Sequence, residues 1–127
     1  MIVVRSLVSI VDDDESVRES LPDLVRELGF SAHAFSPAEE FLASDSINET
    51  KCLILDIAMP GMSGPDLQIE LKRLEKKIPI VFITAHANEA DRRELIELGA
   101  VDCLYKPFNE VDLLRAINTA LGMNGSK

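Results

Sequence analysis

Short apolar runs alternate with amphipathic stretches along most of this chain. Five runs have the length of buried strands, and they cover residues 7–11, 31–35, 52–55, 78–83 and 101–105. Between and after these runs, hydrophobic residues recur every three or four positions, as they do on one face of a helix. The pattern therefore predicts strand–helix units repeated around a parallel sheet, with helices on both faces and a fifth helix closing the chain.

The helical stretches indicate which side chains face the core. The predicted core positions are Val17, Leu21, Leu24, Val25 and Leu28 in the first helix, Leu67, Leu71 and Leu74 in the third, and Leu114, Ile117 and Leu121 in the last. Pro22 falls inside the first of these stretches, where a proline costs roughly 3 kcal/mol or kinks the helix.

Residues that favour helix ends agree with these boundaries. Asp14 precedes the first helix, and Ser36 with Glu39 has the spacing of a capping box around Pro37 at the start of a short second helix. The third helix is predicted to open at Gly64 and Pro65. The predicted caps of the last two helices are Asn88 and Asn109.

Length and composition predict one globular domain in a reducing compartment. The 127 residues, 46% of them hydrophobic, are enough for a core without disulfides, so residues 1–121 are predicted to form one domain and 122–127 a tail or truncated linker. Cys52 and Cys103 lie inside apolar runs without metal-ligand spacing, which favours reduced core cysteines in a cytoplasmic protein. The apolar opening carries Arg5 and lacks a cleavage site, so neither a signal peptide nor a membrane span is expected.

The net charge limits the partners of this domain. A formal charge of −9 at pH 7 opposes binding to nucleic acids and to anionic membranes, because both depend on clustered lysine and arginine. We therefore expect no direct contact of this domain with DNA or lipid.

Reactive side chains follow the predicted strands. Asp12 and Asp13 come after the first strand, Asp56 after the third, Thr84 after the fourth and Lys106 after the fifth. Functional residues of open parallel sheets gather at the carboxyl ends of the strands. Carboxylates gathered there repel each other by about 4 kcal/mol per pair at 4 Å and an effective dielectric of 20, so a cation is needed. A set of oxygen ligands favours Mg²⁺, whose coordination shell leaves room for water and a phosphate beside a few protein ligands.

Four motifs carry a resemblance over residues 7–121. The stretches "VDDD", "LILDIAMPGMSG", "ITAH" and "LYKPF" occur in the order found in receiver domains of two-component response regulators, and the chain is most similar to receivers that precede LuxR-type DNA-binding domains. The resemblance implies a doubly wound, flavodoxin-like α/β fold with a five-stranded parallel sheet in the order 2-1-3-4-5. It also implies phosphorylation-dependent signalling rather than enzymatic turnover.

The resemblance assigns roles residue by residue. Asp56 matches the phosphoryl acceptor, Thr84 the switch hydroxyl and Lys106 the lysine that binds the phosphoryl group. Mg²⁺ would be held by Asp12, Asp13, Asp56 and the carbonyl of Ala58. The phosphoryl donor would be a sensor histidine kinase, and phosphorylation would favour a homodimer through the fourth helix, fifth strand and fifth helix. A cis peptide bond is implied between Lys106 and Pro107.

Two other functions use similar ingredients. A Mg²⁺-dependent phosphohydrolase with an aspartyl intermediate would carry a second acid two residues after the nucleophile, where this chain has Ala58. A flavodoxin-like cofactor binder would need a Ser/Thr/Gly-rich phosphate loop after the first strand, where the acidic "DDDES" repels phosphate.

One position departs from the receiver pattern. Three residues before the lysine that matches Lys106, receivers usually carry an aromatic side chain that moves during switching, but this chain has Cys103. Tyr105 lies two residues further along the strand, on the same face as Cys103, and is the only tyrosine of the sequence. The sequence therefore leaves two interpretations: Tyr105 packs against the fourth helix and takes part in the switch, or it is a static surface aromatic.

Overall fold

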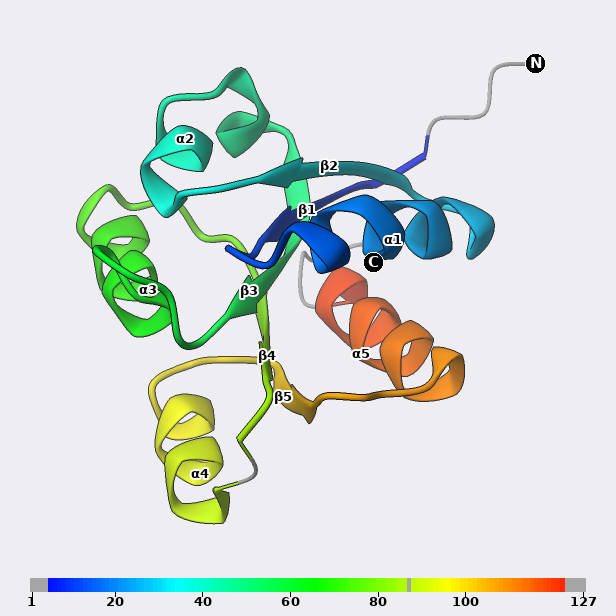
Figure 1. The fold of residues 1–127 in the computed structure, drawn as a ribbon. Helices are drawn as coiled ribbons and strands as arrows, with labels where there is room; N and C mark the ends of the chain where they lie inside the picture. The colour runs from blue at the N-terminus through cyan, green and yellow to red at the C-terminus, as the bar shows by residue number, and fades with distance from the viewer. Residues whose placement is uncertain (1–4, 87, 123–127) are drawn as a thin grey trace.

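The computed structural model describes residues 5–86 and 88–122, which build a five-stranded parallel sheet covered by helices (Figure 1). The strands are β1 (Leu7–Val11), β2 (Ser31–Phe35), β3 (Thr50–Asp56), β4 (Ile80–Thr84) and β5 (Asp102–Tyr105). The helices are α1 (Glu15–Glu27), α2 (Ala38–Leu42), the 3₁₀ helix η1 (Asp45–Asn48), α3 (Gly64–Arg73), α4 (Glu89–Glu97) and α5 (Glu110–Gly122). The strand order β2-β1-β3-β4-β5 confirms the predicted topology.

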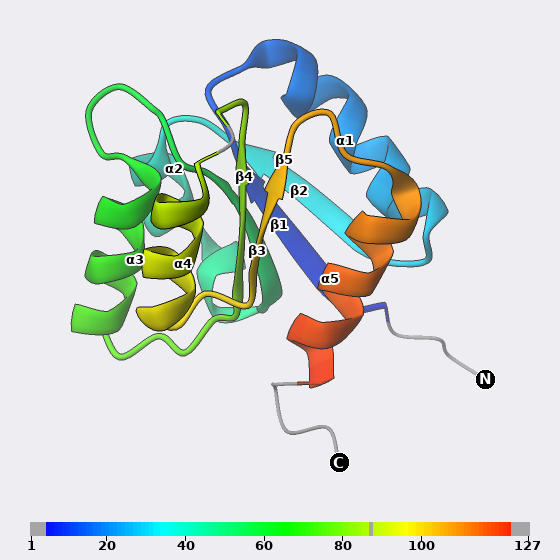
Figure 2. The ribbon, with the colours of Figure 1, turned by 90° about the horizontal axis from the view of Figure 1, so that it is seen from below.

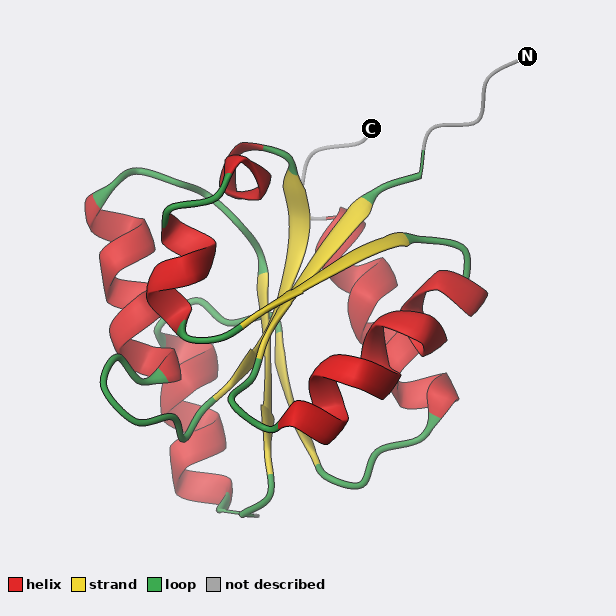
Figure 3. Ribbon diagram, turned by 45° about the horizontal axis from the view of Figure 1, so that its top comes forward, coloured by secondary structure: helices red, strands yellow, loops and turns green. Residues whose placement is uncertain are grey.

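The sheet separates two layers of helices. Helices α1 and α5 cover one face, while α2, α3 and α4 cover the other (Figures 2 and 3). Because successive side chains of a strand point to opposite faces, each strand feeds both layers. Ile54 and Ile83 pack with α1 and α5, whereas Leu55 and Phe82 pack with the opposite helices. The central strands are therefore buried on both faces, as their apolar runs indicate.

Helix starts follow the predictions in part. Asp14 caps α1 by accepting a hydrogen bond from the Ser16 amide, and Asn88 caps α4 in the same way. The capping box predicted at Ser36 is wrong, because Pro37 has an extended backbone and occupies the N-cap position itself. Ser36 consequently lies one residue too early, and its amide donates to Glu40 instead.

The start of α3 carries a capping box that the sequence analysis missed. Ser63 accepts from the amide of Asp66, whose side chain accepts from the Ser63 amide. Ser63 directly precedes the predicted Gly64–Pro65 opening, and the reciprocal pair satisfies two amides at the helix N-terminus.

Two residues predicted for the core, Leu74 and Leu114, do not pack in it. Helix α3 ends at Arg73, and Leu74 at its C-cap is 39% exposed, because Glu75 takes a left-handed backbone with φ of 59° and turns the chain away. In α5 the buried face is displaced by one position toward small residues, and it consists of Leu113, Ala116, Ile117 and Ala120. Leu114 is half-buried, because the alanines allow the helix to approach the sheet along their own side.

Helix α1 continues through Pro22, which is buried beside Leu21. Within residues 5–86 and 88–122, no helix has the length and apolar character that a bilayer crossing requires.

Gly64 permits the closest approach between α3 and the sheet. A Cβ atom at this position would collide with the carbonyl oxygen of Asp56 and would lie 3.0 Å from the Cα of Ile57. Gly64→Ala is expected to lower the free energy of unfolding by about 1–3 kcal/mol, because backbone atoms must move to admit the methyl group. Urea denaturation would measure the change. Gly122→Ala is the matched control, since nothing lies within 4 Å there, and an equal effect of both substitutions would contradict the argument.

Candidate functional site

Strand register brings the predicted site residues to one edge of the sheet. Val11 of β1 pairs with Leu55 of β3, so Asp12 and Asp56, which follow them, lie on neighbouring strands at the same level. On the other side, the amide of Lys106 donates to the carbonyl of Thr84 at 2.7 Å. The carboxyl ends of β1, β3, β4 and β5 thus meet in one site.

Three carboxylates form the acidic part of this site. Asp12, Asp13 and Asp56 each offer an oxygen, and these oxygens lie within 4.8 Å of one another. Asp12 is fully buried and Asp56 is 6% exposed, whereas Asp13 is open to solvent. Two of the carboxylates are thus buried, and the third lies at the entrance of the site. Such a cluster of hard oxygen donors is able to bind a metal ion, and the donor set suits a divalent cation that keeps part of its water shell.

Lys106 is the cation nearest to these acids. Its Nζ lies 3.0 Å from Oδ2 of Asp12 and 3.9 Å from Oδ1 of Asp56, so Asp12 is the closer partner. Asp12 also accepts from the Asp14 amide at 2.8 Å, which satisfies both of its oxygens. The bond between Lys106 and Pro107 is cis, as the resemblance implied.

The environment of Asp56 changes its acidity. Burial and the neighbouring Asp12 raise the pKa of the Asp56 carboxyl to about 7, against an opposing effect of Lys106. The carboxyl is therefore divided between its protonated and ionised forms near neutral pH. Added positive charge at the site would favour the ionised form, which is the nucleophilic one.

Thr84 and Ala58 complete the set of predicted residues. Thr84 is 5% exposed, and its Oγ1 accepts from the His86 amide at 3.1 Å, which leaves the hydroxyl proton available for donation. Ala58 lies exposed in the loop after β3, and its carbonyl remains a predicted metal ligand.

The sequence analysis missed one cation beside the acidic cluster. Arg18 in α1 donates from Nη1 to the carbonyl oxygen of Asp12 at 3.0 Å. Arg18 belongs to no motif, and only the path of α1 over the end of β1 brings it there. Its guanidinium group helps to hold the backbone that presents Asp12 and Asp13.

An apolar groove opens next to the site. It has a volume of about 440 Å³ and runs between α1 and the segment after β5. Val17, Leu21 and Leu24 line one wall, and Lys106, Pro107 and Phe108 contribute to the other. The groove therefore provides a contact surface with the lysine of the site at its edge.

Comparisons with known proteins match this geometry. Residues 8–118 match the family described as the response regulator receiver domain. Response regulator protein TodT of Pseudomonas putida is 47% identical over 116 residues, which are 91% of this chain and 51% of TodT. The chain therefore spans about half the length of that relative.

Solved structures agree with the sequence match. The structure of response regulator StyR superposes with a TM-score of 0.86 at 43% identity, covering 96% of this chain and 62% of the StyR chain. The structure named FixJ-N superposes with a TM-score of 0.82 at 35% identity and covers 96% of both chains.

Proposed function

This chain belongs to the response regulator receiver family and acts in phosphorylation-activated signalling, and from that premise we propose that Asp56 is the residue that carries the phosphoryl group. The observation that carries this proposal is a nearly buried carboxylate at the end of β3, with Lys106 at 3.9 Å and two further carboxylates within 4.8 Å. It combines a nucleophile with the charges that a phosphoryl group requires.

The transfer is a displacement at phosphorus. An Asp56 oxygen forms a bond to the phosphorus of a phosphohistidine on a sensor kinase, while the P–N bond breaks and its electron pair stays on the imidazole nitrogen. Lys106 binds a phosphoryl oxygen, and the Thr84 hydroxyl donates to another. Receiver domains interact with sensor kinases, and the groove between α1 and Phe108 is the surface that we assign to this contact.

A divalent cation is part of the proposed site. Asp12, Asp13 and Asp56 would hold it together with the Ala58 carbonyl, and Mg²⁺ fits a donor set made of oxygens alone. When bound, the ion supplies positive charge that neutralises the carboxylates and the incoming phosphoryl group. Asp12 orients Lys106 through their 3.0 Å contact, and Asp13 remains accessible at the entrance.

Intact mass after incubation with acetyl phosphate and Mg²⁺ tests this function. We expect a gain of one phosphoryl group that decays slowly, because Ala58 supplies no side-chain acid to activate water. Rapid release of phosphate would favour the phosphohydrolase instead. A mass unchanged under all conditions would contradict the assignment.

Mg²⁺ is expected to stabilise the folded protein. Preferential binding to the native state at 100 times the dissociation constant contributes about 2.7 kcal/mol, enough to raise the melting temperature by several degrees. Asp13→Asn should remove most of this rise in a thermal melt with and without Mg²⁺. Asp14→Asn is the matched control, since asparagine preserves the α1 cap and Asp14 is outside the cluster. Equal responses of both variants would exclude Asp13 as a ligand.

The output of this domain is proposed to pass through α4, β5 and α5. Phosphorylation would change this face and favour a homodimer through it, and an output domain such as a LuxR-type DNA-binding domain would respond. The receiver itself is proposed to catalyse only its own phosphorylation and slow dephosphorylation, in the cytoplasm.

A further inference from the structure

Helix α4 is held to the sheet by little apolar contact. Of the residues that the structure describes in α4, only Leu95 is buried, whereas α5 buries Leu113, Ala116, Ile117 and Ala120. An element with few buried apolar side chains is less firmly held in place. The position of α4 therefore depends strongly on its polar contacts.

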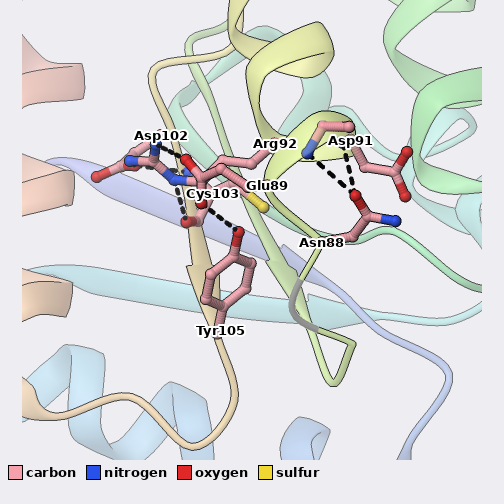
Figure 4. Close-up of polar contacts among 8 residues, drawn as sticks. Asn88, Glu89, Asp91, Arg92, Asp102, Cys103 and Tyr105 are labelled. Atoms are coloured by element: carbon pink, nitrogen blue, oxygen red, sulfur yellow. Dashed lines mark hydrogen bonds and ion pairs between the residues drawn. The ribbon is translucent and has the colours of Figure 1, made fainter.

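Those polar contacts converge on one arginine (Figure 4). Arg92 lies in α4, and its Nη2 is 3.0 Å from Oδ1 of Asp102 in β5, while its Nε donates to the Cys103 carbonyl at 3.4 Å. Its Nη1 is 3.4 Å from Oε2 of Glu89, whose Oε1 accepts from the Tyr105 hydroxyl at 3.3 Å. Glu89, Arg92, Asp102 and Tyr105, called here the Arg92 cluster, thus connect α4 to both ends of β5.

The Arg92 cluster is only partly open to solvent. The side chains of Arg92 and Asp102 are 34% and 32% exposed, so their pair is less screened than an ion pair in full contact with water. The carboxylate of Asp102 also accepts from the Cys103 amide at 2.7 Å, which orients it toward Arg92. The pair is therefore a charge-assisted hydrogen bond with a fixed geometry.

The Glu89–Tyr105 side of the Arg92 cluster lies next to the proposed phosphorylation site along the chain. Glu89 opens the helix that follows the loop after Thr84, and Tyr105 directly precedes Lys106. A movement of Thr84 or Lys106 toward a phosphoryl group on Asp56 would consequently displace one side of the cluster relative to the other.

In this structure, neither Thr84 nor Lys106 has Asp56 as its closest partner. Lys106 is nearer to Asp12, at 3.0 Å against 3.9 Å, and the Thr84 oxygen accepts from the loop amide of His86. The contacts of the Arg92 cluster therefore belong to an arrangement in which the phosphoryl-binding groups have other partners.

Because the side chain at Cys103 is small, the contacts of Arg92 matter more for holding α4 on β5. Cys103 is buried in the same apolar cluster as Phe82 and Leu95, and a thiol of this size cannot act as the aromatic side chain usual in receivers. We propose that Arg92 is a positioning residue that holds α4 on β5 and thereby stabilises this arrangement against the one in which Thr84 and Lys106 contact a phosphoryl group. This inference rests on the proposed function of Asp56.

Thermodynamic linkage predicts the direction in which removal of Arg92 changes ligand affinity, whereas a purely structural role predicts no increase. If Arg92 stabilises the competing arrangement, its removal must increase affinity for any ligand that selects the phosphoryl-bound one. Charge-assisted hydrogen bonds of this kind support an expected increase of about 3- to 10-fold. A residue that merely supports the fold would leave the affinity unchanged or reduce it.

Calorimetric titration with beryllofluoride and Mg²⁺ measures this affinity, because beryllofluoride mimics an aspartyl phosphate without a kinase. Arg92→Gln is expected to bind 3- to 10-fold more tightly than the wild type, with faster amide exchange in α4. Arg93→Gln is the matched control, since Arg93 is the exposed neighbour without a described partner, and its affinity should equal that of the wild type.

Asp102→Asn provides a second route if Arg92→Gln fails to fold. The amide retains the acceptor oxygen for the Cys103 amide but loses the charge that holds Arg92, so the same increase in affinity is expected. Unchanged or weaker binding in the folded variants would overturn the role of Arg92 alone. Absence of binding by the wild type would overturn the proposed function and this inference together.

Discussion

Asp56→Asn is expected to abolish uptake of a phosphoryl group from acetyl phosphate while leaving the fold intact. The amide has nearly the volume of the carboxylate, but its nitrogen and oxygen are poor nucleophiles, so the acceptor is lost without a cavity. Intact mass measured over time would show no phosphorylated species, and a thermal melt would show a cooperative transition.

Asp23→Asn is the control for this experiment. It makes the same chemical change at an exposed position, where the ion pair with Arg26 contributes little to stability. Its uptake should match that of the wild type. Phosphorylation of Asp56→Asn at the wild-type rate would mean that another side chain is the acceptor.

The stability of the metal-free protein is expected to fall as pH rises from about 4 to about 7. The pKa of Asp56 is raised from 3.8 to about 7 in the folded state, so over this range the native protein keeps a proton that the unfolded chain has released. Ionisation of the buried carboxyl therefore opposes folding progressively, and the effect is complete above the folded-state pKa. The full shift corresponds to at most about 4 kcal/mol.

Urea denaturation at several pH values in a chelator would measure this dependence. Other groups also titrate in this range, so the informative quantity is the stability of Asp56→Asn minus that of the wild type. We expect this difference to be small near pH 4 and to grow in favour of the variant toward pH 8. A difference that does not vary with pH would show that Asp56 ionises normally.

The sequence could predict that these residues lie together, because parallel strands impose a simple geometry. Residues at the carboxyl ends of β1 and β3 must meet at one edge once the strands are adjacent, so Asp12 and Asp56 needed no detailed packing to be placed together. The cysteine prediction succeeded for a related reason, since an apolar run that forms a central strand buries whatever it contains. Cys52 and Cys103 are both free and buried.

The errors came where local signals permit two answers. The "DLLRAI" stretch of α5 allows either of two leucines to face the sheet, and alanine, which the hydrophobic pattern weights weakly, decided in favour of Leu113. The end of α3 carries no glycine to mark it. Glu75 adopts the left-handed conformation that glycine usually takes after a helix. Both outcomes depend on packing and backbone geometry.

The Arg92 cluster could not be predicted from the sequence. Arg92 and Asp102 belong to different elements and to no motif, and either residue alone resembles an ordinary solvated charge. Their contact exists only because α4 folds back beside β5. Contacts of this kind between elements are thus less visible in a sequence than residues that end a strand within a motif.

The division of the core by the sheet has a thermodynamic consequence. Leu113 packs in the apolar cluster under α1 and α5, whereas Leu95 packs in the separate cluster under α2, α3 and α4. Free-energy changes at distant sites without shared partners add, so substitutions on the two faces should combine independently. Helix α4 can accordingly loosen or shift without weakening the layer that α1 and α5 form on the opposite face of the sheet.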